Sequence, residues 1–228
     1  MVNTRQSLKI VAALLLATLV LGTAPYYRNG SIPYIEEVVM NEELICRPDW
    51  MVQAHADLKR HEGFRPYPYP DPLSTLGKKH GSKFGYKPAR EVLNSLGASE
   101  ESGRPWTIGY GFAVGVTPDT SMVTEEQASE RLWEKIPVYS AKLNKLVPNW
   151  YDMPSHVITV LVNLMFNMGE GTMATFKNTL KLFNEGKYEA AGNNLTKSLW
   201  YKQVGNRAVE LTQRLVKGTI DSKHRVDS

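Results

Sequence analysis

Residues 61–71, "HEGFRPYPYPD", join two kinds of backbone structure. Before them, the apolar residues of segment 50–62 recur at helical spacing, and Gly63 is a helix stop signal. After them, the prolines of "RPYPYPDP" exclude a helix and favour an extended edge strand that turns at Asp71-Pro72. A helix that leads at once into an extended strand indicates a fold of mixed α and β structure.

A second extended segment, "WTIGYGFAVG" at 106–115, is short, aromatic and interrupted by glycines. It predicts a strand with close backbone approach at Gly109 and Gly111. From residue 124 onward the pattern is helical, and it opens with a capping box of Thr124 and Gln127. We expect helices at 124–136, 138–146, 155–167, 173–184, 187–199 and 205–217, the last ending at Gly218. The predicted fold class is α+β, with a small β-sheet lobe, a larger helical lobe and a cleft between them.

The composition is that of a globular protein with a mildly basic surface. The chain has 228 residues, of which 42% are hydrophobic and 22% charged, and this excludes a disordered chain. A formal net charge of +4 favours nucleic acid, anionic lipid or bacterial wall as partner. Nucleic acid is the weakest of these, because no stacking aromatics alternate with the basic residues.

Motifs for cofactors are missing from the sequence. No zinc-ligand spacing, P-loop or Gly-rich dinucleotide turn occurs, so we expect no metal and no cofactor. The single cysteine, Cys46, excludes an intramolecular disulfide. It is either a free thiol or a link between two chains, and we expect a monomer.

Residues 1–28 indicate an export or membrane signal. Basic residues precede an uncharged stretch, 10–27, that is long for a signal-peptide core and short for a spanning helix. It is either a signal peptide, cut for example after Gly22, or a retained inner-membrane anchor weak enough to leave the membrane later. The basic residues predict export of the rest of the chain, to the periplasm of the host. Residues 29–49 would form a linker to the main domain.

Three blocks of the chain resemble the phage-type lysozyme family, in the family's order. "HEGFRPYPYPD" resembles the segment in which an aspartate follows a glutamate by nine residues, and "TIGYG" resembles the Thr-Ile-Gly-x-Gly strand. The longest match is 163–208, with its Phe-x-Met-Gly-Glu, Phe-x-Asn-x-Leu, Trp-Tyr-x-Gln and Asn-Arg-Ala blocks. The resemblance spans about 50–220 and leaves a tail at 221–228.

The resemblance implies an endolysin-type muramidase that cuts the β-1,4 bond between N-acetylmuramic acid and N-acetylglucosamine in peptidoglycan, by inversion, and so lyses the host cell. Glu62 would be the general acid, while Asp71 and Thr107 would hold a water molecule on the opposite sugar face. Its place at a helix C-terminus favours a proton on Glu62. Arg207 would hold Glu62 in place. By the same motif matching, the sugar-binding residues would be Phe166, Thr179, Asn194 (or its neighbour Asn193) and Ala113.

An insertion at 73–106 departs from the family pattern, which has only a short turn there. It separates Asp71 from Thr107 by 35 residues, 72–106, so another acid is an alternative to Asp71. We assign Asp71 because its spacing from Glu62 is kept. The insertion is basic and predicts a solvated loop with a short helix at "AREVLNSL", or else a lid or a contact for the anionic wall. Phe112 stands where the family commonly has a histidine.

Two other functions fit parts of the pattern. A non-catalytic wall-binding protein would keep the fold while the insertion degrades the site, but the intact Glu62, Asp71 and Thr107 argue against it. A lytic transglycosylase needs one acid and no aspartate that holds water, and it leaves anhydro sugar ends.

Overall fold

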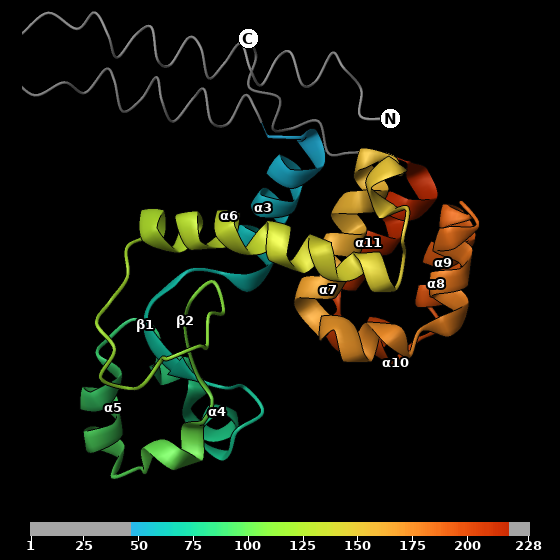
Figure 1. Ribbon diagram of the computed structural model, residues 1–228. Helices are drawn as coiled ribbons and strands as arrows, with labels where there is room; N and C mark the ends of the chain where they lie inside the picture. Colours follow the sequence, from blue (N-terminus) through green and yellow to red (C-terminus); the bar gives the residue numbers. More distant parts are fainter. Residues whose placement is uncertain (1–46, 219–228) are drawn as a thin grey trace, which may run out of the picture. The chain divides into compact units, whose positions relative to one another are not determined.

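Helix α3, Asp49–Glu62, leads into strand β1, Arg65–Pro70, as the opening stretch predicts (Figure 1). Gly63 ends the helix with a φ of 67°, and its N–H donates to the carbonyl of Lys59. The computed structural model describes residues 47–218. The predicted export segment 1–28, most of the linker 29–49 and the tail 221–228 lie outside the described residues.

Strand β2, Trp106–Gly109, pairs with β1 in an antiparallel two-stranded sheet, with Thr107 opposite Tyr69. The strand is shorter than the predicted 106–115, because the chain turns back and Phe112 bridges Ile108. Both glycines of the turn have positive φ, 65° at Gly109 and 86° at Gly111. A side chain at Gly109 would also lie 3.1 Å from Cβ of Ala128, so this turn packs closely on the next helix.

The insertion folds around a core of its own. It contains helix α4, Thr75–His80, and helix α5, Ala89–Leu96, with 3-10 turns at Gly81–Lys83 and Glu100–Gly103. Its buried apolar cluster consists of Tyr69, Leu76, Phe84, Ala89, Val92, Leu93 and Trp106. The predicted helix "AREVLNSL" is confirmed, and the predicted solvated loop is wrong. Side chains of the insertion and of both strands bury one another, and this burial orders the segment.

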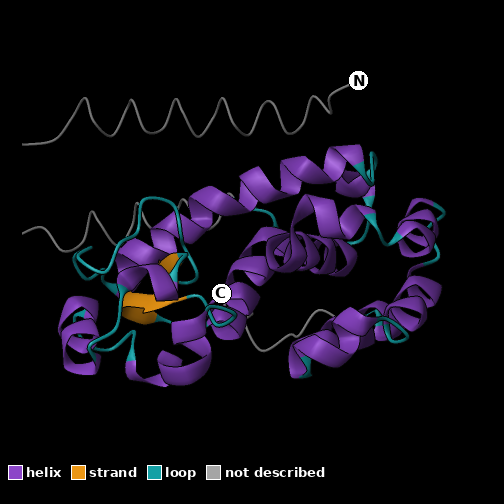
Figure 2. Ribbon diagram, turned by 90° about the horizontal axis from the view of Figure 1, so that it is seen from below, coloured by secondary structure: helices purple, strands orange, loops and turns teal. Residues whose placement is uncertain are grey.

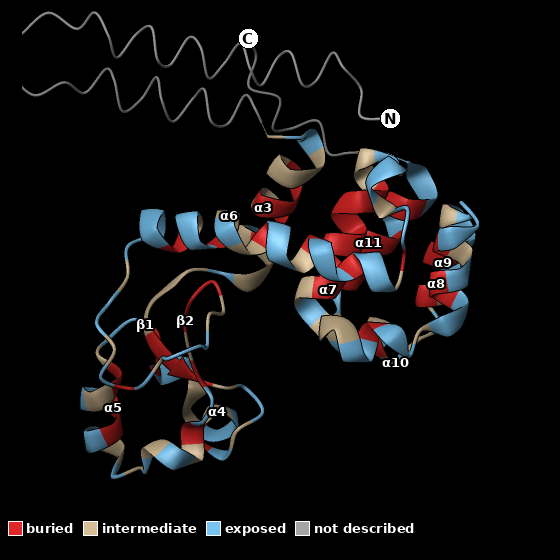
Figure 3. Cartoon of the chain, in the orientation of Figure 1, coloured by how far each residue is buried: buried red, intermediate tan, exposed pale blue. Residues whose placement is uncertain are grey.

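The helical lobe surrounds a buried central helix, α7. Its helices are α6 (Glu125–Lys142), α7 (Ser155–Ala174), α8 (Lys177–Asn184), α9 (Tyr188–Leu195), α10 (Leu199–Val204) and α11 (Asn206–Lys217), with 3-10 turns at Leu143–Lys145 and Trp150–Asp152. Figure 2 shows both strands in one lobe, with short helices around them, and only helices and loops in the other lobe. Helices α3, α6 and α11 contact α7, and Figure 3 shows that the first part of α7 is mostly buried. The predicted α+β class is confirmed.

Helix α7 is also the one described helix long and apolar enough to cross a membrane. Most of its first three turns are buried in the core, including Val157, Val160, Leu161 and Leu164, which form the predicted apolar stripe. Its length and apolarity are therefore explained by the core. The predicted membrane segment 10–27 lies outside the described residues.

Three predicted helix boundaries are wrong. The break expected at residue 137 does not occur, because α6 continues through the exposed Pro137. Leu132, Ile136 and Leu143 on either side of it are fully buried, and this burial outweighs the cost of about 3 kcal/mol for an interior proline. Helix α7 extends past a kink at Gly169, so the next helix, α8, begins at Lys177 and not at 173. The helix predicted at 187–199 is two helices, α9 and α10.

The predicted caps are confirmed. The Thr124 hydroxyl accepts from the backbone N–H of Gln127 at 3.2 Å, and the Gln127 side chain accepts from the N–H of Thr124 at 3.0 Å. Gly218 ends α11 in the left-handed conformation, with a φ of 65°.

An ion-pair network joins the last turns of α3 to α11. The buried Asp57 carboxylate binds Arg214, and Arg60 donates to both oxygens of Glu210 at 2.6 Å. His61 Nε2 lies 3.1 Å from Oε2 of Glu210. Burial alone would raise the pKa of Glu210, but the hydrogen bonds from His61 and Arg60 outweigh it and hold this pKa well below its usual value. The end of α3 is therefore fixed to α11.

His55 lies between α3 and α6. Its ring stacks on Trp133 with 3.7 Å between ring centroids, and its Nε2 lies 3.0 Å from the hydroxyl of Ser129. Burial, together with the positive charges of Lys59 and Arg47, lowers the pKa of His55 to about 4, although a hydrogen bond with the Ser129 carbonyl opposes this shift. The folded protein therefore keeps this imidazole neutral in mild acid.

We predict that His55→Phe reduces the acid sensitivity of folding. Between pH 6.5 and about pH 4 the unfolded chain binds a proton at His55 and the folded chain does not, so stability falls as pH falls through this window. The wild type should lose about 2 kcal/mol more than the variant between about pH 7 and about pH 5. Urea denaturation at both pH values measures this difference. Equal losses in both proteins would contradict the assignment.

Candidate active site

Glu62, the last residue of α3, is held by an arginine from the other end of the chain. Nη1 of Arg207, near the start of α11, donates to Oε1 of Glu62 at 2.6 Å. Nε of Arg207 donates to Oδ1 of Asn163 on α7 at 2.8 Å. The Arg207 side chain is only 9% exposed, so solvent screens the ion pair weakly. Three helices meet at this carboxylate.

The second oxygen of Glu62 faces the turn after β2. A Cβ atom placed on Gly111 would lie 3.6 Å from Oε2 of Glu62. Within residues 47–218, Oε2 has no hydrogen-bond partner. Arg207 therefore orients the carboxyl through Oε1 and leaves Oε2 free to act on a ligand.

The turn that faces Glu62 is fixed to α6. The hydroxyl of Tyr110, between the two glycines, donates to Oε1 of Glu125 at 2.8 Å. Nζ of Lys59 lies 2.9 Å from the same oxygen. The hydrogen bonds from Lys59 and Tyr110 lower the pKa of Glu125, so it remains a carboxylate. Helices α3 and α6 and the turn thus share one charged contact beside the site.

Asp71 and Thr107 lie at adjacent ends of the two strands. The N–H of Asp71 donates to the carbonyls of Gly103 and Pro105, at 3.1 and 3.0 Å. The hydroxyl of Thr107 donates to the carbonyl of Tyr69 at 3.3 Å, two residues before Asp71. The insertion therefore returns to its own starting point, and the strand pairing brings Asp71 and Thr107 together across 35 intervening residues, 72–106.

The acids of the insertion are placed elsewhere. Glu100 binds Arg90 at 2.6 Å, and Glu101 binds Arg104 at 3.0 Å. Glu91 is exposed in the first turn of α5. None of the three lies on a strand beside Thr107, so the geometry favours Asp71 over another acid of the insertion.

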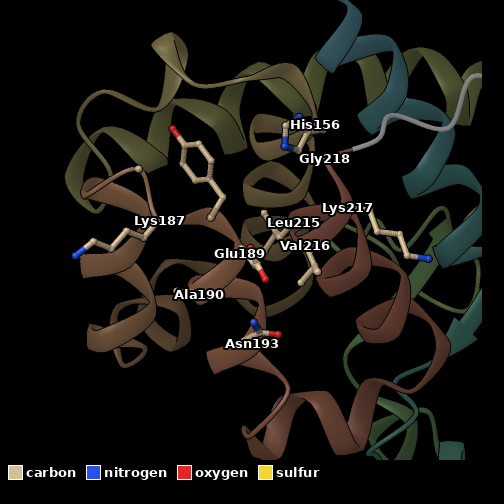
Figure 4. A pocket seen from close by; sticks show the side chains of 11 residues that line it. His156, Lys187, Glu189, Ala190, Asn193, Leu215, Val216, Lys217 and Gly218 are labelled. Carbon is tan, nitrogen blue, oxygen red and sulfur yellow. The ribbon is translucent and has the colours of Figure 1, made fainter.

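Thr179 and Asn194, two of the predicted sugar-binding residues, are in contact. Nδ2 of Asn194 on α9 donates to the hydroxyl of Thr179 on α8 at 2.8 Å. Asn193, the alternative, instead lines the hollow drawn in Figure 4, together with His156 and Glu189. The contact with Thr179 favours Asn194.

The other two predicted sugar-binding residues have less defined surroundings. Phe166 is half-buried on α7, and its ring packs on Tyr139 of α6 with 4.9 Å between centroids. Ala113 is exposed in the segment after the β2 turn, next to Val114, which is 89% exposed. No hydrogen bond or ring contact among the described residues joins either one to Glu62, so their assignment still rests on the motif.

The hollow in Figure 4 is a separate feature. The first turn of α7, α9 and the end of α11 line it, and it contains none of Glu62, Asp71 and Thr107. Burial and the charge of Arg214 lower the pKa of His156 at its edge. It offers no pair of free carboxyls for acid–base chemistry.

Asn163 is the site residue that sequence reasoning missed. It is fully buried, its Oδ1 and its backbone carbonyl both accept from Arg207, and its Nδ2 is buried without a partner in the described part of the chain. The sequence carries a signal for it: a carboxamide inside the apolar stripe of α7. A buried polar side chain at such a position needs a partner, and here the partner is the arginine that holds Glu62.

Comparison of the sequence with known proteins gives matches over the region that contains the candidate site residues. The model of the phage lysozyme family matches residues 59–217. A relative from Dictyostelium discoideum, described as probable T4-type lysozyme 1, is 26% identical over 116 residues, which cover 49% of this chain and 68% of the relative. The family match runs from the last turn of α3 to the end of α11 and therefore includes Glu62, Asp71, Thr107 and Arg207. The chain belongs to the phage lysozyme family, and its activity class is that of a lysozyme-like muramidase.

Proposed function

We propose that the protein is an endolysin-type muramidase that hydrolyses the β-1,4 bond between N-acetylmuramic acid and N-acetylglucosamine with inversion, and thereby lyses the host cell. Its family supports a glycoside hydrolase that acts on peptidoglycan. One observation carries the finer proposal. Arg207 binds one carboxyl oxygen of Glu62 and leaves the other oxygen free. Asp71, which directly follows β1, lies near Thr107 on the paired strand β2.

The proposed reaction uses two carboxyls in opposite protonation states. Glu62 gives its proton to the bridging oxygen as the bond from C1 to that oxygen breaks. The oxygen of a water molecule bonds to C1 from the opposite face, and Asp71 takes the proton that this water loses. The hydroxyl of Thr107 orients the water. Glu62 ends the step as a carboxylate, which the ion pair with Arg207 stabilises.

The surroundings of Asp71 favour hydrolysis over transglycosylation. Its backbone is held by two carbonyls of the insertion, and one side-chain oxygen, Oδ1, accepts from the N–H of Leu73 at 2.6 Å. Its other oxygen has no partner among residues 47–218 and is available to bind water. A transglycosylase has no use for an aspartate fixed in this way.

We predict that Glu62→Gln lowers the rate at which permeabilised bacteria are cleared by about 10²–10⁴-fold, because it removes the transferable proton. Glu91→Gln, an exposed acid of α5, is the matched control and should leave the rate unchanged. The mass of the wild-type products tests the reaction type. Hydrolysed sugar ends support the proposal, and anhydro ends indicate a transglycosylase. A wild type that clears nothing would favour a wall-binding protein.

We further propose that the enzyme is exported to the periplasm as a monomer and that residues 10–27 tether it to the inner membrane until release. The support is the uncharged apolar stretch behind basic residues. The intact mass of the periplasmic form tests this proposal. A chain that keeps residues 10–27 and becomes soluble after membrane depolarisation is the expected result. A chain that starts near Thr23 would mean a cleaved signal peptide, and a cytoplasmic chain would contradict export.

A further inference from the structure

The insertion carries both paired and unpaired charges. Arg90 binds Glu100 and also Asp119, which lies after β2, while Arg104 binds Glu101. These pairs involve α5 and the 3-10 turn that follows it. They neutralise both arginines of the insertion and two of its three acids.

The lysines of the insertion all precede α5 in the chain. Lys78 and Lys79 are on α4, Lys83 is in the 3-10 turn after it, and Lys87 lies just before α5. All four are exposed, and none forms an ion pair within residues 47–218. We call these four residues the lysine patch. It places four positive charges on a stretch of ten residues, 78–87, that contains no acid.

The patch is fixed to the candidate aspartate through backbone contacts. The hydroxyl of Ser74, which caps α4, donates to the carbonyl of Asp71 at 2.6 Å and accepts from the N–H of Gly77 at 2.9 Å. A Cβ atom at Gly77 would lie 1.9 Å from the carbonyl oxygen of Asp71, so only glycine lets α4 approach this closely. Lys78 and Lys79 directly follow that glycine. The backbone of α4, which carries Lys78 and Lys79, is therefore held against the backbone of Asp71.

The orientation of the insertion agrees with a role in substrate binding. Figure 1 shows α4 on the side of the small lobe nearer to the helical lobe, and α5 on the far side. Lys78 and Lys79, which are on α4, thus lie on the side of the insertion nearer to the helical lobe, and the paired Arg90, which is on α5, lies on the far side.

We propose that the lysine patch binds the carboxylates of peptidoglycan stem peptides while the glycan strand lies at Asp71. This inference rests on the proposed muramidase function. The sugars beside the cut bond carry N-acetyl and hydroxyl groups, so the negative charge of this substrate lies on its peptides. Lysine ammonium groups suit such a ligand, because each is a mobile point charge that needs no fixed bidentate partner. The insertion thereby adds a surface that binds the stem peptides to a site that cleaves the glycan strand.

The test is binding of the full-length chain, made inactive by Glu62→Gln, to purified sacculi at low salt. One variant carries Lys78, Lys79, Lys83 and Lys87 changed to Gln. The matched control carries the same change at Lys135, Lys142, Lys197 and Lys217 of the helical lobe, which also have no ion pair in the described part. Each protein is sedimented with intact sacculi, with sacculi whose peptide carboxylates have been converted to amides, and with anionic phospholipid vesicles.

The patch variant should bind intact sacculi about tenfold more weakly than the control, and the difference should vanish on the amidated sacculi and at high salt. Equal binding by both variants to intact sacculi would overturn the proposal. A difference that persists on the amidated sacculi would also overturn it, and one confined to vesicles would identify a membrane-binding surface instead. Cleavage by the active wild type is measured separately, so a failure of the muramidase proposal is distinguishable from a failure of this one.

Discussion

The ion pair between Glu62 and Arg207 is the contact on which the site depends. It joins residues 145 positions apart and brings together the end of α3, the start of α11 and, through Asn163, the middle of α7. The side chain of an acid at the end of a helix can adopt many orientations. A hydrogen bond from a mostly buried guanidinium group stabilises one of these orientations. The neighbouring network of Asp57, Arg214 and Glu210 fixes the same two helices about one to two turns away. Two separate sets of contacts therefore fix the position of Glu62.

The second half of the site depends on backbone geometry. Strand pairing sets Thr107 opposite Tyr69, and carbonyls of Gly103 and Pro105 accept from the N–H of Asp71. The insertion between these residues has its own buried core, so it lengthens the chain without opening the sheet. Loop insertions of this kind cost little when the two ends stay close, because the cost of closing a loop grows slowly with its length. A domain interrupted between two candidate catalytic residues thus keeps them side by side.

Local patterns predicted what depends on local interactions. The end of α3 at Gly63, the capping box at Thr124 and the helix at Ala89–Leu96 follow from short-range rules, and the structure confirms them. The same rules predicted a helix break at Pro137 that does not occur. Burial of side chains against distant parts of the chain outweighs the local preference of proline to end a helix. The core of the insertion and the role of Asn163 arise only from long-range packing. Motif order identified the candidate site residues, and the kept spacing from Glu62 selected Asp71, but the contacts that orient these residues needed the structure.

The most direct test of this account is the rate of peptidoglycan cleavage by Arg207→Gln, compared with the wild type at matched folded fractions. If Arg207 orients the acid, the maximal rate falls by about 10²-fold while substrate binding changes little, because a small misplacement of a catalytic group is costly. An unchanged maximal rate in a folded Arg207→Gln protein would contradict the account, since the carboxyl of Glu62 would then be positioned without its ion pair.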